Sequence, residues 1–104
     1  MIHPDERDTP KYKLKRVFEL IEQGHYRVTR TAQNTAASDL GVKPLQIIKI
    51  VSKLKEEDFV KSQKVTTGKG WFDIYYKKIK GLLAYIKLTI EEGKTLIVVS
   101  FKEK

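Results

Sequence analysis

The chain has 104 residues, of which 40% are hydrophobic, and its formal net charge is +8 at pH 7. This length and composition fit one folded domain over residues 1–104 and exclude a disordered chain. The absence of cysteine excludes disulfides, thiolate zinc sites and a cysteine nucleophile. No apolar run approaches the 18 residues of a membrane span. We therefore expect a cytoplasmic protein with no membrane contact.

The first ten residues, MIHPDERDTP, are polar and acidic and contain two prolines. They lack the apolar core of a signal peptide, so residues 1–10 are expected to form a flexible arm. After the arm, apolar residues recur at the spacing i, i+3, i+4, i+7, which marks one face of a helix. They are Leu14, Val17, Phe18 and Ile21, and Gly24 is expected to end this helix.

Two further helices are expected in the first half of the chain. The second is capped by Thr29 or Thr31, carries alanines at a four-residue spacing, and ends with Leu40 before Gly41. The third begins at Pro44, because proline suits the first turn of a helix. Its apolar stripe consists of Leu45, Ile47, Ile48, Val51 and Leu54.

From about Phe59 the pattern changes from helical to strand-like, with glycines between the segments. Four strands are expected, over residues 59–66, 70–77, 82–91 and 94–102, and the short links between them predict an antiparallel meander. The order of elements therefore predicts an α+β domain, in which N-terminal helices pack on one face of a C-terminal antiparallel sheet.

Alternation along the last two strands predicts which side chains face the helices. In the third strand these are Ala84, Ile86, Leu88 and Ile90, and in the fourth they are Ile97, Val99 and Phe101. The other face of the sheet then carries Tyr85, Lys87 and Lys102.

Residues 61–80, KSQKVTTGKGWFDIYYKKIK, hold six lysines against one acid, with four aromatic residues among them. Lysines neutralise phosphates and aromatic rings stack on unpaired bases, so this composition favours a nucleic-acid partner. The alternative is a set of solvated cations on the exposed face of an ordinary basic protein.

The sequence gives little support for other kinds of functional site. The two histidines, His3 and His25, have no accompanying ligand spacing, so no metal site is expected. The segment TTGKGW lies between strands and lacks the strand–loop–helix context of a phosphate-binding loop. No nucleophile elbow for a serine triad is present.

A winged-helix DNA-binding regulator is the main alternative on residues 1–80. TAASDLGVKPLQIIKIVSKLKEEDFV places a short helix, a turn and a longer helix in sequence, and the basic hairpin would serve as a wing. Two features argue against it, since the third helix starts with the apolar PLQIIKIV and two long strands follow the hairpin. A basic RNA-binding module without catalysis is a third reading.

Lys61, Tyr85, Lys87 and Lys102 have the chemistry that RNA cleavage requires. Attack by the RNA 2′-OH needs a proton acceptor, a proton donor for the 5′ oxygen, and positive charge on the crowded phosphorus. One cation about 6 Å from a lysine lowers its pKa by roughly 2 units at an effective dielectric of about 20, so a cluster can bring one amine near neutrality. Because RNA supplies the nucleophile, no metal or other cofactor is required.

Several segments, in order along nearly the whole chain, resemble the MqsR family of toxins. They are TPKYKLKRV, GHYRVTRTA, DLG, EDFVKS, WFDIYY, YIKLTI and the closing LIVVSFKEK. The resemblance implies a RelE-like ribonuclease fold and a ribosome-independent mRNA interferase that cuts at short GC-containing triplets and arrests growth. It also implies a cognate antitoxin of the MqsA type, which binds zinc and DNA, so that zinc would belong to the partner.

The resemblance also implies site residues. The family's catalytic lysine, tyrosine and C-terminal lysine match Lys61, Tyr85 and Lys102. A family glutamine after the tryptophan is replaced by Phe72, and Gln63 is a candidate to supply the missing amide. Lys87, Lys77 and Lys78 are expected to guide the RNA backbone. Glu103 and Lys104 are expected to be tail residues.

Overall fold

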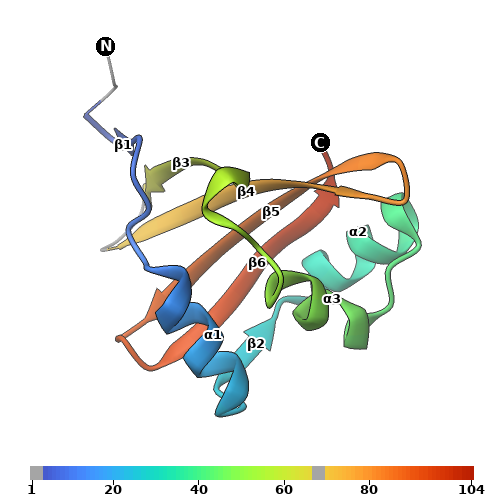
Figure 1. Cartoon of the computed structure of the whole chain (residues 1–104), viewed down its shortest axis with the longest axis horizontal. Coiled ribbons are helices and arrows are strands. Elements are labelled where there is room, and N and C mark those ends of the chain that lie inside the picture. The colour runs from blue at the N-terminus through green and yellow to red at the C-terminus, as the bar shows by residue number, and fades with distance from the viewer. Residues whose placement is uncertain (1–3, 67–69) are drawn as a thin grey trace.

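The computed structural model describes residues 4–66 and 70–104, and within them three helices lie on one side of a single sheet (Figure 1). The helices are α1 (Leu14–Glu22), α2 (Arg30–Leu40) and α3 (Pro44–Val51), followed by the short 3-10 helix η1 (Glu56–Asp58). The strands are β1 (Glu6–Arg7), β2 (Tyr26–Val28), β3 (Phe59–Lys64), β4 (Trp71–Ile79), β5 (Leu82–Glu91) and β6 (Thr95–Glu103). The expected α+β class is confirmed.

The sheet has the order β1-β3-β4-β5-β6-β2, and β3 to β6 form the expected antiparallel meander. Two short strands extend it beyond the four that were expected. β1 pairs antiparallel with β3, and β2 pairs parallel with β6. The segment expected to be a flexible arm therefore contains a strand, because its backbone finds pairing partners on the sheet edge. Residues 1–3 lie outside the described part of the chain.

Helix α2 is tied to the sheet through its cap. The Thr29 hydroxyl accepts a hydrogen bond from the Ala32 N–H at 3.1 Å, which confirms one of the two expected caps. The same hydroxyl donates to the carbonyl of Val99 in β6 at 3.0 Å. Gly41 ends the helix with φ of 64°, a left-handed conformation that favours glycine.

The hydrophobic core lies between the helices and the sheet. The helix-facing residues expected in β5 are confirmed, since all are buried in this core. In α3 the expected stripe is only partly correct, because Leu45 is 84% exposed while Ile47 and Val51 are fully buried. Leu45 lies in the first turn of the helix, on the side that faces solvent.

The helix-facing set expected in β6 is wrong at two of its three positions. Phe101 is buried in the core as expected, but its core neighbours are Leu96 and Val98. The register explains the difference, since Leu88 pairs with Val98 and Lys87 pairs with Ser100, which leaves Val99 as an extra residue in a β-bulge. A bulge of one residue reverses the alternation on either side of it.

Candidate functional site

The face of the sheet opposite the helices carries the candidate site. Cross-strand partners project from the same face, so the register shows which side chains meet there. Tyr85 in β5 lies between Tyr76 in β4 and Lys102 in β6. The expectation that Tyr85, Lys87 and Lys102 share one face is therefore confirmed by the strand pairing.

The adjacent rows bring in the remaining strands. Lys87 lies between Ile74 of β4 and Ser100 of β6, and Ile74 also pairs with Lys61 of β3. One step further along the sheet, Gln63 pairs with Phe72.

Two cations lie over the tyrosine pair. The ring centroids of Tyr76 and Tyr85 are 6.1 Å apart. The Lys102 Nζ lies 5.3 Å from the centroid of the Tyr85 ring, and the Lys104 Nζ lies 5.3 Å from that of Tyr76. Contact with a ring face holds an ammonium in place without neutralising its charge, so both amines stay available to an anion.

The surroundings of Tyr85 favour its neutral phenol over the phenolate. Partial burial raises the pKa of Tyr85, the neighbouring Tyr76 raises it further, and Lys61 acts in the opposite direction. The phenol therefore stays neutral near pH 7 and offers one O–H donor.

Lys61 and Lys87 have opposite electrostatic environments. The Lys61 Nζ donates to the Glu6 carboxylate at 2.6 Å, and this hydrogen bond raises the pKa of Lys61. Burial, followed by repulsion from Lys102, lowers the pKa of the Lys87 amine, which lies 4.9 Å from the centroid of the Phe72 ring. Lys61 is thus held as a cation, while Lys87 is the lysine that releases its proton more easily.

A hollow of about 430 Å³ lies beside these lysines. It is lined by Asp5, Glu6, Gln63, Lys64, Thr66, Phe72 and Lys87. Gln63 and Phe72 therefore lie together at one edge of the lysine cluster, where an amide and an aromatic ring can contact a nucleotide base.

The structure does not bring all the predicted residues together. Lys77 pairs across the sheet with the buried Ala84, and its Nζ lies 3.8 Å from Asp58 in η1, so it lies on the helix-bearing face. Lys78 is exposed and pairs with Leu83, at the far end of β4 from Gln63. Lys78 shares the open face by alternation, whereas Lys77 does not.

Sequence reasoning missed three residues of this face. Tyr76 and Lys104 lie within the tyrosine and lysine cluster. Strand alternation was a signal for both, since Tyr76 pairs with Tyr85 and Lys104 lies two residues after Lys102. Glu6 had no local signal, because only the pairing of β1 with β3 brings it to Lys61.

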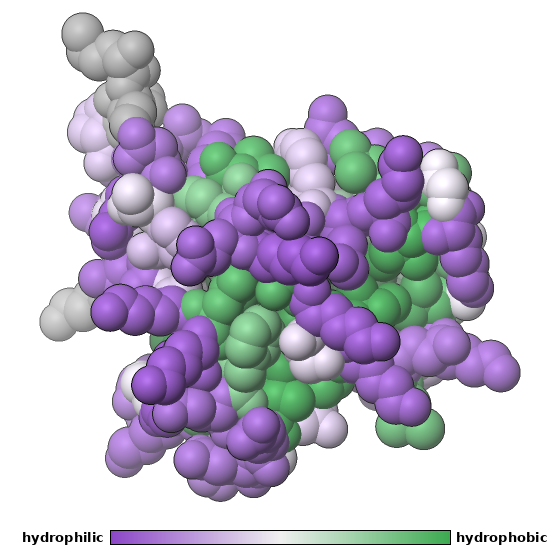
Figure 2. Space-filling view, in the orientation of Figure 1, coloured by the Kyte–Doolittle hydropathy of each residue, from purple (hydrophilic) through white to green (hydrophobic). Residues whose placement is uncertain are grey.

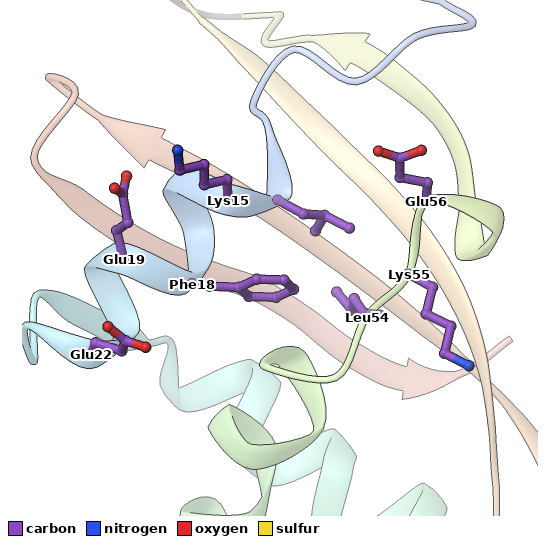
Figure 3. Close-up of a pocket in the computed structure, with 8 residues that line it drawn as sticks. Lys15, Phe18, Glu19, Glu22, Leu54, Lys55 and Glu56 are labelled. Carbon is purple, nitrogen blue, oxygen red and sulfur yellow. The ribbon is translucent and has the colours of Figure 1, made fainter.

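The helix-bearing face has a mixed surface (Figure 2). On it, polar side chains border strips of apolar surface (Figure 2). One hollow there lies between α1 and the segment before η1, where Phe18 and Leu54 face each other and charges of both signs, such as Lys15 and Glu19, form the rim (Figure 3). A rim of mixed sign gives no preference for an anionic polymer.

Neither a metal-binding cluster nor a membrane-spanning helix is found in the described part of the chain. In residues 4–66 and 70–104, no group of three or more His, Asp or Glu side chains is arranged to hold a metal ion. His3 lies outside these ranges. No helix in the same ranges is long and apolar enough to cross a membrane.

The winged-helix alternative is not favoured by the topology. Strands β3 and β4, which would form the wing, are interior strands of the sheet, with β1 on one side and β5 on the other. A wing needs a hairpin that projects from the domain, and the hairpin here contributes to the sheet that supports the core.

Comparison with known proteins gives the same result as the order of motifs. Residues 9–103 match the family described as motility quorum-sensing regulator, toxin of MqsA. The chain is also 32% identical over 100 residues to the mRNA interferase toxin MqsR of Escherichia coli (strain K12). The aligned region covers 95% of this chain and 99% of the relative. This chain therefore belongs to the MqsR toxin family.

Proposed function

We propose that this protein is an endoribonuclease toxin that cleaves mRNA in the cytoplasm independently of the ribosome. The proposal rests on membership of the MqsR family and on the name of its relative, an mRNA interferase toxin. The single structural observation that supports it is the cluster of lysines and tyrosines on the open face of the sheet, in which Lys102 and Lys87 flank Tyr85 without an acid between them.

In the proposed reaction the RNA supplies its own nucleophile. The 2′ oxygen attacks the adjacent phosphorus as its proton passes to a base, the bond from phosphorus to the 5′ oxygen breaks, and that oxygen takes a proton from an acid. The products are a 2′,3′-cyclic phosphate and a 5′-hydroxyl. No step needs a metal, because lysine ammonium groups stabilise the charge that develops on phosphorus.

We assign the catalytic positions to Lys61, Tyr85 and Lys102. Lys61 and Lys102 bind the scissile phosphate, and the neutral Tyr85 phenol donates a hydrogen bond or a proton to the reacting oxygens. Lys87 and Lys78 contact the flanking backbone, and Phe72 and Gln63 contact a base. We propose cleavage at short GC-containing triplets from the resemblance to the family.

The proposed regulator is a cognate antitoxin of the MqsA type, in line with the family description. Such an antitoxin binds zinc and DNA through its own chain, so the toxin needs no zinc ligands for the complex. Co-expression of this chain with its antitoxin is expected to restore growth.

Incubating the purified protein with RNA or with duplex DNA, in EDTA, separates the candidate functions. Cut RNA with 2′,3′-cyclic phosphate ends is the expected result, and mapping the cut sites tests the proposed triplets. RNA that is bound but intact would indicate a binding module, and tight duplex DNA binding without cleavage would indicate a regulator. Either outcome overturns the proposal.

A further inference from the structure

The N-terminal strand carries a carboxylate into the lysine cluster. We propose that Glu6 is a positioning residue of this site, whose carboxylate fixes the Lys61 ammonium in the orientation that binds the scissile phosphate. This inference rests on the proposed function, since it concerns a residue of the same site. It gives the segment before α1 a role in catalysis, although no motif in that segment indicates one.

The backbone around Glu6 is fixed to the strand that carries Lys61. Glu6 pairs with Gln63, and the Lys64 N–H donates to the carbonyl of Asp5 at 2.8 Å. On the other side, the guanidinium of Arg7 lies 5.7 Å from the centroid of the Trp71 ring. Because Gln63 is two residues from Lys61, Glu6 is a diagonal neighbour of Lys61 on the same face, within reach of a long side chain.

The contact itself suits positioning. The Lys61 Nζ lies 2.6 Å from the Glu6 Oε2, and the two side chains are 41% and 31% exposed. An ammonium on a flexible four-carbon stem samples many rotamers, and a carboxylate at this distance selects one of them. The ammonium has three N–H donors, so one bond to Glu6 leaves two for phosphate oxygens.

The other lysines of the site are held by different means. Lys102 and Lys87 lie over the rings of Tyr85 and Phe72, which restrict them without a charged partner. Lys61 has no such ring contact among those described, and the Glu6 carboxylate takes that place. The carboxylate also raises the pKa of Lys61, so the group that meets the phosphate is an ammonium and not a free amine.

The test compares the full-length wild type with four variants: E6Q, K61M, the double variant E6Q/K61M, and D8N as the matched control. Asp8 is an exposed acid two residues from Glu6, so D8N removes the same charge from the same segment. Steady-state cleavage of a short RNA with one cut site gives kcat and KM, and thermal unfolding monitors the fold.

In E6Q we expect kcat to fall about tenfold, the ratio between a charge-assisted and a neutral hydrogen bond, while KM is unchanged or lower because the protein gains net positive charge. D8N should keep the wild-type kcat. In the K61M background E6Q should cause no further loss, since Glu6 acts through Lys61. A kcat for E6Q equal to or above that of D8N, or an equal loss in both backgrounds, would overturn the inference.

An NMR titration of the Lys61 side chain, assigned with K61M, gives a readout that does not need RNA. The titration midpoint of Lys61 should fall in E6Q and stay at the wild-type value in D8N. If the wild type fails to cleave RNA, the proposed function fails, and this titration still decides whether Glu6 controls Lys61. An unchanged midpoint in E6Q overturns the inference.

Discussion

Asp73 is a buried carboxylate whose replacement should test what holds the N-terminal segment to the sheet. It lies in β4 with 0% exposure. Its two oxygens accept hydrogen bonds from the backbone N–H groups of Lys11 and Tyr12 at 3.0 and 2.9 Å, and from the Ser62 hydroxyl at 2.6 Å. These bonds attach the residues before α1 to the centre of the sheet.

The structure sets the size of the expected effect of Asp73→Asn. Asparagine has one carbonyl oxygen and presents an NH₂ group at the other position, so one of the two backbone N–H groups of residues 11 and 12 loses its acceptor and faces another donor. A hydrogen bond to a charged group contributes about 1.5–3 kcal/mol, and a buried donor without a partner adds a desolvation penalty. We expect the free energy of unfolding to fall by about 2–3 kcal/mol, which corresponds to about 10–20 °C in Tm for a domain of this length.

Urea denaturation followed by circular dichroism measures this loss directly. Ser62→Ala removes one donor but leaves the carboxylate and both backbone bonds, so it should cost about 1 kcal/mol. Asp8→Asn, at an exposed position, should stay within about 0.5 kcal/mol of the wild type. A loss of less than about 0.5 kcal/mol in Asp73→Asn would refute the reasoning, since it would mean that the three hydrogen bonds do not depend on the charge.

Three further predictions concern the open face. Lys102→Ala should lower kcat by roughly 10²-fold with an unchanged Tm, the size of effect expected when one preorganised hydrogen-bond donor is lost. Deletion of residues 102–104 should abolish cleavage, whereas deletion of Lys104 alone should leave most of it. Lys78→Ala should weaken RNA binding measured by fluorescence anisotropy, whereas Lys77→Ala should not, since Lys77 lies on the other face beside Asp58. Burial lowers the pKa of Lys87 from its ordinary 10.5, so Lys87 loses its charge at a lower pH than an ordinary lysine and RNA affinity should begin to fall there. Lys87→Arg should move this decline in affinity to higher pH, because arginine stays charged. Identical pH profiles for the two proteins would show that the charge of Lys87 is not needed.

Much of the fold follows from patterns of short range. Helical spacing predicts α1, α2 and α3, and alternation predicts the helix-facing side of β5, because each pattern depends only on which neighbours along the chain are buried together. β1 and β2 have no such pattern. They contain two and three residues, too few for a period, and they exist because the edges of a sheet built by other segments offer backbone partners.

The bulge in β6 shows why alternation predicts one part of the site and fails nearby. Counting in steps of two from Phe101 places Val99 in the core, whereas the extra residue at Val99 leaves Val98 there instead. Lys102 lies after the bulge, so its position opposite Tyr85 is predicted correctly.

The same distinction between local and long-range order separates the two sides of the candidate site. Tyr85, Lys87 and Lys102 lie on adjacent strands joined by a tight turn, so their meeting follows from a short stretch of sequence. Glu6 reaches Lys61 from 55 residues away, through a strand that only the finished sheet can pair. If Glu6 positions Lys61, catalysis depends on an edge strand of only two residues, and loss of β1 should reduce cleavage before the core unfolds. Cleavage measured along a urea titration should then decline at lower urea than the circular dichroism signal, and coincident transitions would show that β1 and the core form one cooperative unit.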